Sequence, residues 1–299
     1  MSEICSCCPR HCGIDRNNTT GFCGVPELPK VAKAFLHMWE EPCISGTNGS
    51  GTVFFSGCNL KCVFCQNYEI SQEGYGKVIT VSRLQEIFLD LIKKGAHNIN
   101  LVNPSHYTKA IKEAILPLKQ QGRINVPIVY NTNGYDSPEN LQDMKGITDV
   151  YLPDFKYFSE KTAVKYAAAP DYPEVCRNAI IEMHKQVGSP VLDSSGIIQK
   201  GLIIRHLILP GHVKESIGIL NWISENLPGD VYVSLMSQYT PYYNAKNFPE
   251  INRPITRNEY QRAVNHIYKL GLEEGYVQER ESSDTQYIPD FNLDGVKIL

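Results

Sequence analysis

The chain has 299 residues, with 29 Lys and Arg residues against 32 Asp and Glu residues. This near balance gives no basic surface for nucleic acid and no acidic tail. The sequence has no apolar run long enough to span a bilayer, and its first residues lack the pattern of a signal peptide. We therefore expect a cytoplasmic protein that binds neither nucleic acid nor membrane and is large enough for one large or two small α/β domains.

Cysteines are concentrated at the start of the chain, because nine of the ten lie within the first 65 residues. In a reducing compartment this clustering indicates metal ligation or redox chemistry. Residues 1–24 lack the periodic apolar pattern that would order so short a segment by burial. We predict a four-ligand site there, for either a structural zinc or an auxiliary iron–sulfur cluster, with the ligands Cys5, Cys8, Cys12 and Cys23. An unmetallated cysteine-rich tail is the alternative.

Residues 25–51 carry few periodic signals and are predicted to be an irregular connector that ends in a Gly- and Ser-rich run. Within it Cys43 is expected to be a packed thiol. We therefore divide the chain into a cysteine-rich extension and connector, residues 1–51, and a main domain, residues 52–299.

The stretch that organises the sequence begins with a short apolar strand expected at 52–56. Cys58, Cys62 and Cys65 follow it directly with the spacing C-x3-C-x2-C. Three thiolates from one tight loop can hold three irons of a cubane cluster and leave the fourth iron without a protein ligand. A zinc knuckle or a set of buried thiols is the alternative, but no fourth Cys or His follows at short range.

From residue 52 onwards, predicted strands and amphipathic helices alternate, which is typical of parallel βαβ units. The expected strands are residues 52–56, 98–103, 126–131, 149–156, 201–209 and 231–236. Helices are expected at residues 81–94, 109–121, 214–226 and 257–270, with a short helix near 137 and helical material between 159 and 186. A hairpin near 191–198 and an edge strand near 275–279 complete the prediction. Six units predict an α/β fold with an open, partial (β/α)6 TIM-like barrel, since a closed barrel needs eight.

The cysteine motif resembles the signature of the radical S-adenosylmethionine (SAM) superfamily, C-x3-C-x-aromatic-C, with Phe64 at the aromatic position. The surrounding residues, such as Glu41-Pro42 and the run Cys65-Gln66-Asn67-Tyr68-Glu69, are similar to those of the branch that contains the pyruvate formate-lyase activating enzyme. This resemblance implies a [4Fe-4S] cluster that reductively cleaves SAM to a 5′-deoxyadenosyl radical, which abstracts a hydrogen atom from a substrate.

Four positions at the carboxyl ends of the predicted strands are expected to face the barrel mouth, where barrel enzymes place their chemistry. After the second strand, relatives place a Gly-Gly-Glu turn that this chain lacks, and we expect Asn103, Ser105 or His106 to take over part of its role. A structural role for His106 as a helix cap is the alternative.

The third strand ends in Asn131-Thr132-Asn133-Gly134, which resembles the family's ribose-binding turn, so Asn131 and Asn133 are expected to bind the cofactor. In the fourth, Asp154 and Lys156 share a face by strand alternation. They resemble the family's Asp-x-Lys, which implies contact with the ribose or methionine part of the cofactor, and a salt bridge that closes the barrel is the alternative.

On the fifth strand, Arg205 interrupts an apolar run. A buried arginine needs an anionic partner, and the methionine carboxylate of SAM is the candidate. His206 should point the opposite way, towards the covering helices. Residues 238–243, beyond the sixth strand, are polar and aromatic and form a candidate substrate loop.

Three functions remain open at this point. The resemblance favours a radical SAM oxidoreductase, with a reductant such as flavodoxin or ferredoxin, whose hydrogen donor is a backbone glycine of a partner enzyme. A small molecule or a peptide is the alternative substrate. A non-enzymatic iron–sulfur or zinc-binding electron-transfer protein is the alternative from another class. The catalytic residue beyond the cluster cysteines is unknown.

Overall fold

The computed structural model describes residues 4–279 and 289–297. Its strands form one open, mostly parallel sheet in the order β10-β9-β8-β6-β5-β4-β2-β1-β3, with β7 paired to β8 outside this path. The strands are β1 Lys30–His37, β2 Ser50–Phe55, β3 Lys77–Val78, β4 Ile99–Val102, β5 Ile128–Thr132, β6 Val150–Pro153, β7 Val191–Leu192, β8 Ile198–Leu207, β9 Tyr232–Met236 and β10 Gly275–Val277. This arrangement confirms the predicted partial barrel.

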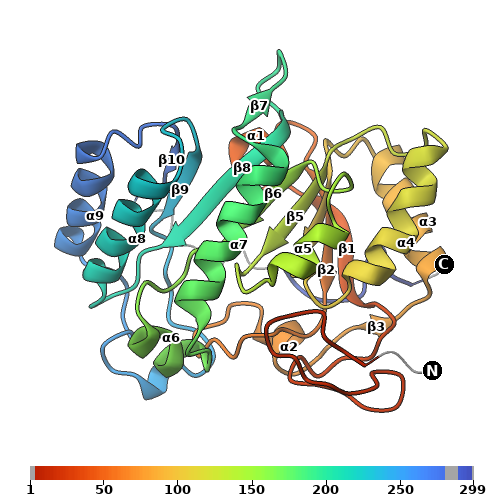
Figure 1. Cartoon of the computed structure of the whole chain (residues 1–299), viewed down its shortest axis with the longest axis horizontal. Helices are drawn as coiled ribbons and strands as arrows, with labels where there is room; N and C mark the ends of the chain where they lie inside the picture. The colour runs from red at the N-terminus through yellow and green to blue at the C-terminus, as the bar shows by residue number, and fades with distance from the viewer. Residues whose placement is uncertain (1–3, 280–288, 298–299) are drawn as a thin grey trace.

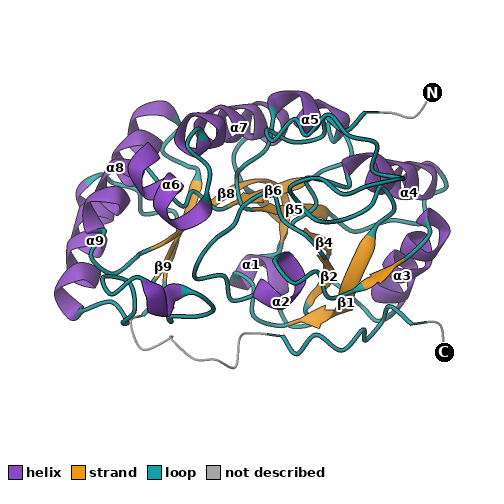
Figure 2. Cartoon of the chain, turned by 90° about the horizontal axis from the view of Figure 1, so that it is seen from below, coloured by secondary structure: helices purple, strands orange, loops and turns teal. Residues whose placement is uncertain are grey.

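Helices cover the outer face of the sheet in an arc, while α1 and α2 lie on its inner side (Figure 2). They are α1 Pro42–Ser45, α2 Tyr68–Ser71, α3 Val81–Lys93, α4 Thr108–Gln120, α5 Pro138–Asp143, α6 Glu160–Ala167, α7 Tyr172–Val187, α8 Val213–Asn226 and α9 Arg257–Lys269. Local sequence sets their starts: the Thr80 side chain caps α3, and Thr256 and Glu259 form a capping box on α9. Within the described ranges, every helix is too short or too polar to cross a bilayer.

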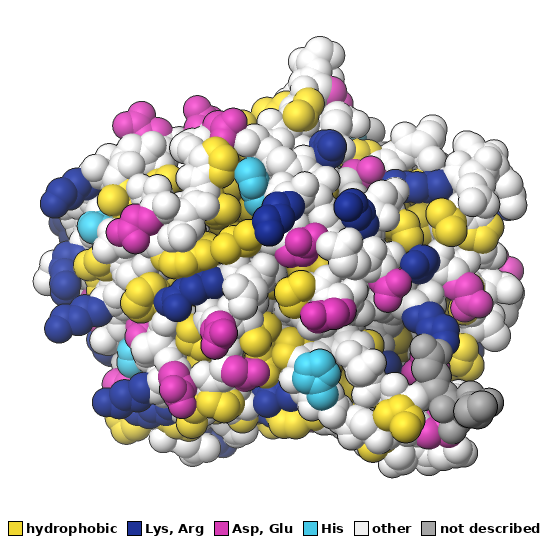
Figure 3. All heavy atoms as spheres, in the orientation of Figure 1, with side chains coloured by type: hydrophobic (Ala, Val, Ile, Leu, Met, Phe, Trp, Pro, Cys, Tyr) yellow, Lys and Arg dark blue, Asp and Glu magenta, His cyan; other side chains and the backbone are white. Residues whose placement is uncertain are grey.

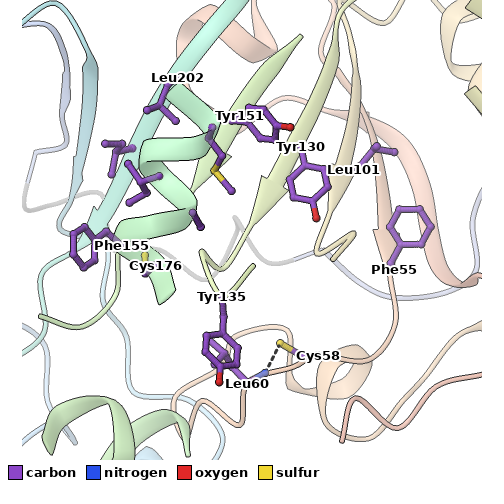
Figure 4. Packing of buried hydrophobic residues seen from close by; sticks show 14 of the residues in the cluster. Phe55, Cys58, Leu60, Leu101, Tyr130, Tyr135, Tyr151, Phe155, Cys176 and Leu202 are labelled. Carbon is purple, nitrogen blue, oxygen red and sulfur yellow. Dashed lines mark hydrogen bonds between the residues drawn. The ribbon is translucent and has the colours of Figure 1, made fainter. Parts of the chain in front are cut away.

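Strand alternation sorts the side chains between the two faces of the sheet. Phe55, Leu101, Tyr130, Tyr151 and Leu202 come from successive strands and join the core beneath the helices (Figure 4). Successive side chains of a strand point to opposite faces of the sheet, so the residue that follows each of these core residues faces the barrel interior. The polar residues of the mouth occupy these alternate positions.

The connector prediction was wrong for residues 30–37, which form β1 and pair antiparallel with β2 and β3. A register shift between Val31 and Lys33 breaks the simple alternation that would have shown a strand. The predicted division at residue 51 stays a prediction, although β1 joins the same sheet as the barrel strands.

The outer surface carries both signs of charge. On the face shown in Figure 3, Lys and Arg side chains are interspersed with Asp and Glu. The carboxyl ends of the strands and the N-terminal segment both lie at the lower side of Figure 1. The two cysteine-rich regions are therefore neighbours in space.

Candidate functional site

A cavity of about 290 Å³ opens at the carboxyl ends of the strands. Its wall includes the three motif cysteines and side chains at or just after the ends of β1, β2, β4, β5, β6, β8 and β9. The predicted site residues that line it are Cys58, Cys62, Phe64, Cys65, Asn103, Asn131, Asn133, Asp154, Lys156 and Arg205. The topology thus brings together residues separated by up to 147 positions, from 58 to 205, at one mouth.

Backbone hydrogen bonds fix the loop that carries the cysteines. The amide of Lys61 donates to the Ala167 carbonyl at 3.0 Å, and that of Val63 donates to the Tyr166 carbonyl at 2.9 Å. The Val63 carbonyl in turn accepts from the amide of Asn244, also at 2.9 Å. The end of α6 and the segment after β9 therefore hold a loop that has no regular secondary structure of its own.

Each motif sulfur has a polar neighbour. The amide of Leu60 and the Asn133 side chain donate to Cys58 Sγ at 3.4 and 3.3 Å (Figure 4 shows the first). The Tyr157 hydroxyl lies 3.8 Å from Cys62 Sγ. The Ser71 hydroxyl is 3.2 Å from the remaining sulfur, on Cys65.

Burial raises the pKa of the Cys62 thiol to about 12 and also raises that of Cys65. Buried thiolates with hydrogen-bond donors around them need a cation in place of the lost protons, and iron is a soft metal that thiolates prefer. This donor set fits a cluster. In residues 4–279 and 289–297, no three His, Cys, Asp or Glu side chains are grouped as ligands of a single ion.

A network of charges forms the other wall of the cavity. Arg205 donates to Asp154 at 2.8 Å, to Glu40 at 3.1 Å and to the Asn131 side chain at 2.6 Å. Lys156 Nζ lies 2.6 Å from the second oxygen of Asp154. The prediction that Asp154 and Lys156 share a face is therefore confirmed.

The two acids of this network are shifted in opposite directions. Burial by itself would raise the pKa of Asp154, but Arg205 and Lys156 together hold it below its usual value. Burial raises the pKa of Glu40, and Arg205 offsets this only in part.

Glu40 is the site residue that sequence reasoning missed. It comes from the segment predicted as a connector, and its carboxylate accepts hydrogen bonds from Asn100 and Asn131 at 3.1 and 3.2 Å, besides that from Arg205. The available signal was a pair of adjacent acids between an apolar run and a proline, at Trp39-Glu40-Glu41-Pro42. Adjacent acids usually lie in solvent. Here Glu40 follows β1 closely, and the pairing of β1 with β2 places its carboxylate at the cavity.

Two asparagines tie neighbouring loops together beside the cluster cysteines. Asn103 adopts a left-handed conformation with φ 59° and donates to the Gly57 carbonyl at 2.6 Å. Besides contacting Cys58, Asn133 donates to the Asn59 side chain at 2.8 Å and accepts from the amide of Tyr135. Both side chains therefore shape the cavity wall.

Ser105 and His106 lie away from this cavity, which corrects their predicted place at the cofactor. His106 is 1% exposed, with Nε2 2.9 Å from the Ser56 carbonyl oxygen, and Ser105 is fully buried with its hydroxyl 3.4 Å from that of Thr132. The chain turns at Asn103, so that the following side chains enter the core instead of the mouth. His206 also lies where expected, since its ring bonds to the Phe155 carbonyl and to Ser216 on α8.

Aromatic side chains surround the opening. The indole of Trp39 lines the cavity while 61% of the residue is exposed. The rings of Tyr68 and Tyr243 stack with centroids 4.9 Å apart, and Phe64 meets Tyr239 edge-on at 5.5 Å. The predicted substrate loop thus contributes Gln238, Tyr239 and Thr240 to the cavity wall.

The cysteines of residues 4–25 form a separate group. Cys8 and Cys23 are buried, and the sulfurs of Cys5 and Cys7 are 3.5 Å apart. Cys12 Sγ accepts from the amide of Phe22 at 3.4 Å. Their assignment as a metal site stays a prediction.

Comparison with known proteins identifies the fold. Residues 52–220 match the family model of the radical SAM superfamily. The uncharacterized protein MJ0674 of Methanocaldococcus jannaschii is 32% identical over 279 residues, which cover 90% of this chain and 75% of that protein. A second uncharacterized protein of the same organism, MJ0808, is 23% identical over 299 residues, covering 91% of this chain and 78% of that protein.

Solved structures with low sequence identity share the fold of this chain. The FeFe-hydrogenase maturase HydG from Carboxydothermus hydrogenoformans is similar with a TM-score of 0.51 and 13% identity, over 74% of this chain and 52% of that one. SuiB of Streptococcus suis is similar with a TM-score of 0.50 and 11% identity, over 81% of this chain and 52% of that one. The chain therefore spans about half the length of these solved structures.

Proposed function

Because the chain belongs to the radical SAM superfamily, we propose that its barrel mouth binds a [4Fe-4S] cluster and SAM and acts as a radical enzyme. The observation that carries this proposal is the meeting of Cys58, Cys62 and Cys65 with a charged network in one cavity. When bound, the reduced cluster and SAM supply a 5′-deoxyadenosyl radical that takes a hydrogen atom from the substrate.

The three cysteines would each hold one iron. The sulfur of Cys58 accepts hydrogen bonds from Leu60 and Asn133, and the sulfurs of Cys62 and Cys65 lie next to the hydroxyl groups of Tyr157 and Ser71. Such donors stabilise negative charge on sulfur and so favour the reduced cluster. Three backbone hydrogen bonds tie the loop to two other segments, which keeps the sulfurs in place.

The charged network suits a ligand that carries both an ammonium and a carboxylate, as the methionine part of SAM does. Arg205 and Lys156 offer cationic donors, and Asp154 and Glu40 offer acceptors, within one hydrogen-bonded group. Asn131, between Glu40 and Arg205, can bond to a hydroxyl or a carbonyl. We assign the cofactor contacts to Asn103, Asn131, Asn133, Asp154, Lys156 and Arg205, with Phe64 beside them and with Glu40 added to this set.

The aromatic rim would limit the access of water to the reacting atoms. Phe64 and Tyr239 pack at the cavity, and the stacked Tyr68 and Tyr243 join segments far apart in the sequence. A substrate that reaches the mouth passes the exposed indole of Trp39.

As the finer proposal, the hydrogen donor is a backbone glycine of a partner enzyme. It is supported by the similarity of the sequence around Cys65 to the activating enzymes and by the exposed aromatic residue at the opening, which a protein loop could cover. The reductant is a low-potential protein such as flavodoxin or ferredoxin.

The central test is anaerobic reconstitution with iron and sulfide, followed by dithionite and SAM. We expect 5′-deoxyadenosine and methionine as products, measured by mass spectrometry. The Cys58→Ala, Cys62→Ala, Cys65→Ala variant is the control and should form neither. An intact, reducible cluster that yields no 5′-deoxyadenosine would refute the radical proposal and favour an electron-transfer protein.

A second experiment addresses the hydrogen donor. Cells that produce the protein are grown on glycine deuterated at Cα, and their extract is divided into a macromolecular and a small-molecule fraction. Each fraction is then mixed with the active enzyme. Deuterium in 5′-deoxyadenosine only with the macromolecular fraction supports a glycyl donor. Turnover stimulated by the small-molecule fraction alone would contradict it.

A further inference from the structure

Residues 4–25 form a closed loop with almost no regular structure. A single antiparallel bridge joins Ile4 to Asp15, and the amide of Cys5 donates to the Ile14 carbonyl at 2.7 Å. Within this loop the amide of His11 bonds to the Cys8 carbonyl at 3.1 Å. These few backbone bonds set the path of the loop, but they supply little of the burial that normally orders a segment of this length.

The thiols of this loop have the same kind of neighbours as the cluster sulfurs at the barrel mouth. Cys12 Sγ accepts from a backbone amide at 3.4 Å, as Cys58 Sγ does. The guanidinium of Arg16 lies 3.6 Å from the sulfur of Cys7, a thiol outside the predicted ligand set that is itself 3.5 Å from the sulfur of Cys5. Amide and guanidinium donors directed at sulfur stabilise thiolates, which are the form that binds metals.

The loop packs directly on the segment that carries Cys58. Arg10 Nε donates to the Asn59 carbonyl at 2.8 Å, and its guanidinium lies over the rings of Phe22 and Tyr135, 3.8 and 5.0 Å from their centroids. Arg10 Nη2 is buried and has no hydrogen-bond partner in the part of the chain that the structure describes. A buried N–H that lacks an acceptor is costly, and a thiolate is one group that can accept it.

The residue before Cys58 is in contact with the loop as well. Gly57 has φ 84°, and a Cβ at this position would lie 2.7 Å from the Cys23 carbonyl oxygen. The backbone of Cys23 therefore touches the turn from which the radical-cluster loop begins.

A second contact runs through Arg16, which is 3% exposed. Its Nη1 donates to the His106 carbonyl at 2.6 Å and its Nη2 to the Pro26 carbonyl at 2.5 Å. His106 in turn bonds to the Ser56 carbonyl at the end of β2. Both arginines thus connect the cysteine-rich loop to the segment around Cys58.

We propose that Cys5, Cys8, Cys12 and Cys23 bind a thiolate-ligated metal centre, and that this centre holds the loop carrying Cys58 in place through Arg10 and Arg16. A bound metal supplies the order that so small a loop cannot gain from burial. Since no three of these thiols converge on a single-ion position in the described residues, binding has to draw the loop together. Metal binding stands by itself, whereas the coupling rests on the proposed function of the barrel mouth.

The first experiment measures metal in reciprocal variants purified without oxygen. In the Cys58→Ser, Cys62→Ser, Cys65→Ser variant we expect about one metal centre per chain to remain. Iron with inorganic sulfide identifies a cluster, and zinc identifies a structural ion. Adding Cys5→Ser, Cys8→Ser, Cys12→Ser and Cys23→Ser should remove it, and residues 4–25 should become sensitive to protease. A folded three-cysteine variant with neither iron nor zinc would overturn the proposal, whatever the SAM assay shows.

The second experiment tests the coupling with Arg10→Gln. We expect this variant to keep the metal of residues 4–25 and to bind less iron at Cys58, Cys62 and Cys65, with an altered electron paramagnetic resonance spectrum of the reduced cluster. Arg123→Gln, at an exposed arginine far along the chain, is the matched control and should behave like the original protein. If Arg10→Gln leaves both the iron content and the spectrum unchanged, the two centres are not coupled through Arg10.

Discussion

Residues 4–25 and the loop of residues 57–65 both present cysteines near the same end of the molecule, yet they are positioned by different means. The second loop leaves the buried strand β2, is held by backbone hydrogen bonds to the end of α6 and to the segment after β9, and faces side chains from β4, β5, β6, β8 and β9 or the loops after them. The first is closed by one β-bridge and rests on two arginines. A sheet can therefore fix the path of a loop that carries cysteines, whereas the path of a short separate loop depends more on what it binds.

The difference also appears in the charged groups of each region. At the barrel mouth, Arg205 and Lys156 pair with Asp154 and Glu40, so that two cations face two acids within the protein. In the N-terminal loop, Arg10 and Arg16 donate mainly to backbone carbonyls. Arg10 and Arg16 thus connect the N-terminal loop to neighbouring segments, while Arg205 belongs to a network that a charged ligand can enter.

The largest contrast is expected between single cysteine variants of the two regions. Cys58→Ser should lower the rate of 5′-deoxyadenosine formation by more than about 100-fold, the upper end of the loss found when only an outer partner of a metal ligand is removed. Cys5→Ser should lower it less, because it acts on the cluster only through the contacts of the N-terminal loop. Both rates are measured by mass spectrometry at matched protein concentration. An equal loss of activity in the two variants would show that the two cysteine regions do not differ in their role.

Replacing Arg205 tests whether the charged network at the barrel mouth contributes to the stability of the folded protein. Arg205→Met leaves Asp154 and Glu40 buried with less compensation and should lower the free energy of unfolding by about 3 kcal/mol. The matched control is Arg253→Met, whose arginine pairs with Glu259 but has a side chain that is 39% exposed, with an expected loss below about 1 kcal/mol. Urea unfolding checks both, and similar losses would contradict a buried network.

The pH dependence of stability should report on the same network. The pKa of Asp154 is lower in the folded protein than its ordinary value of 3.8, so its contribution to stability is present above pH 3.8 and is lost as pH falls through the lowered value. Thermal unfolding followed below pH 3.8 should therefore show a steeper fall for the original protein than for Asp154→Asn. The same slope in both proteins would mean that this carboxylate is not held by Arg205 and Lys156.

The smallest effect is expected from one hydrogen bond to sulfur. Asn133→Ala removes a donor 3.3 Å from Cys58 Sγ, and the midpoint potential of the cluster should become more negative because the reduced state loses stabilisation. Asn18→Ala in the N-terminal loop, which removes a contact to Asp15 instead, is the control from the other region. A redox titration measures both, and an unchanged potential in Asn133→Ala would argue against contact between this amide and the cluster ligand.

Much of the fold and part of the site followed from local patterns. The six principal strands and the helices between them lie within a few residues of their predicted positions, because the alternation of apolar and polar residues is set by burial on the faces of each element. The parity of β6 and β8 placed Asp154, Lys156 and Arg205 on the inner face, and His206 on the outer one. Spacing alone identified the loop of Cys58, Cys62 and Cys65.

Other features depend on contacts between distant segments, which no local pattern reports. β1 exists because it pairs with β2 across a bulge, and this pairing brings Glu40 beneath the sheet to meet Arg205, 165 residues later. The turn at Asn103 sends Ser105 and His106 into the core rather than the cavity. The packing of Arg10 on Asn59 likewise joins two cysteine groups that the sequence presents as separate. The sequence by itself determined the candidate thiol ligands and the strands, because both follow from spacing and period. The tertiary structure decided which charges meet at the mouth, because pairing across the sheet determines the neighbours of each side chain.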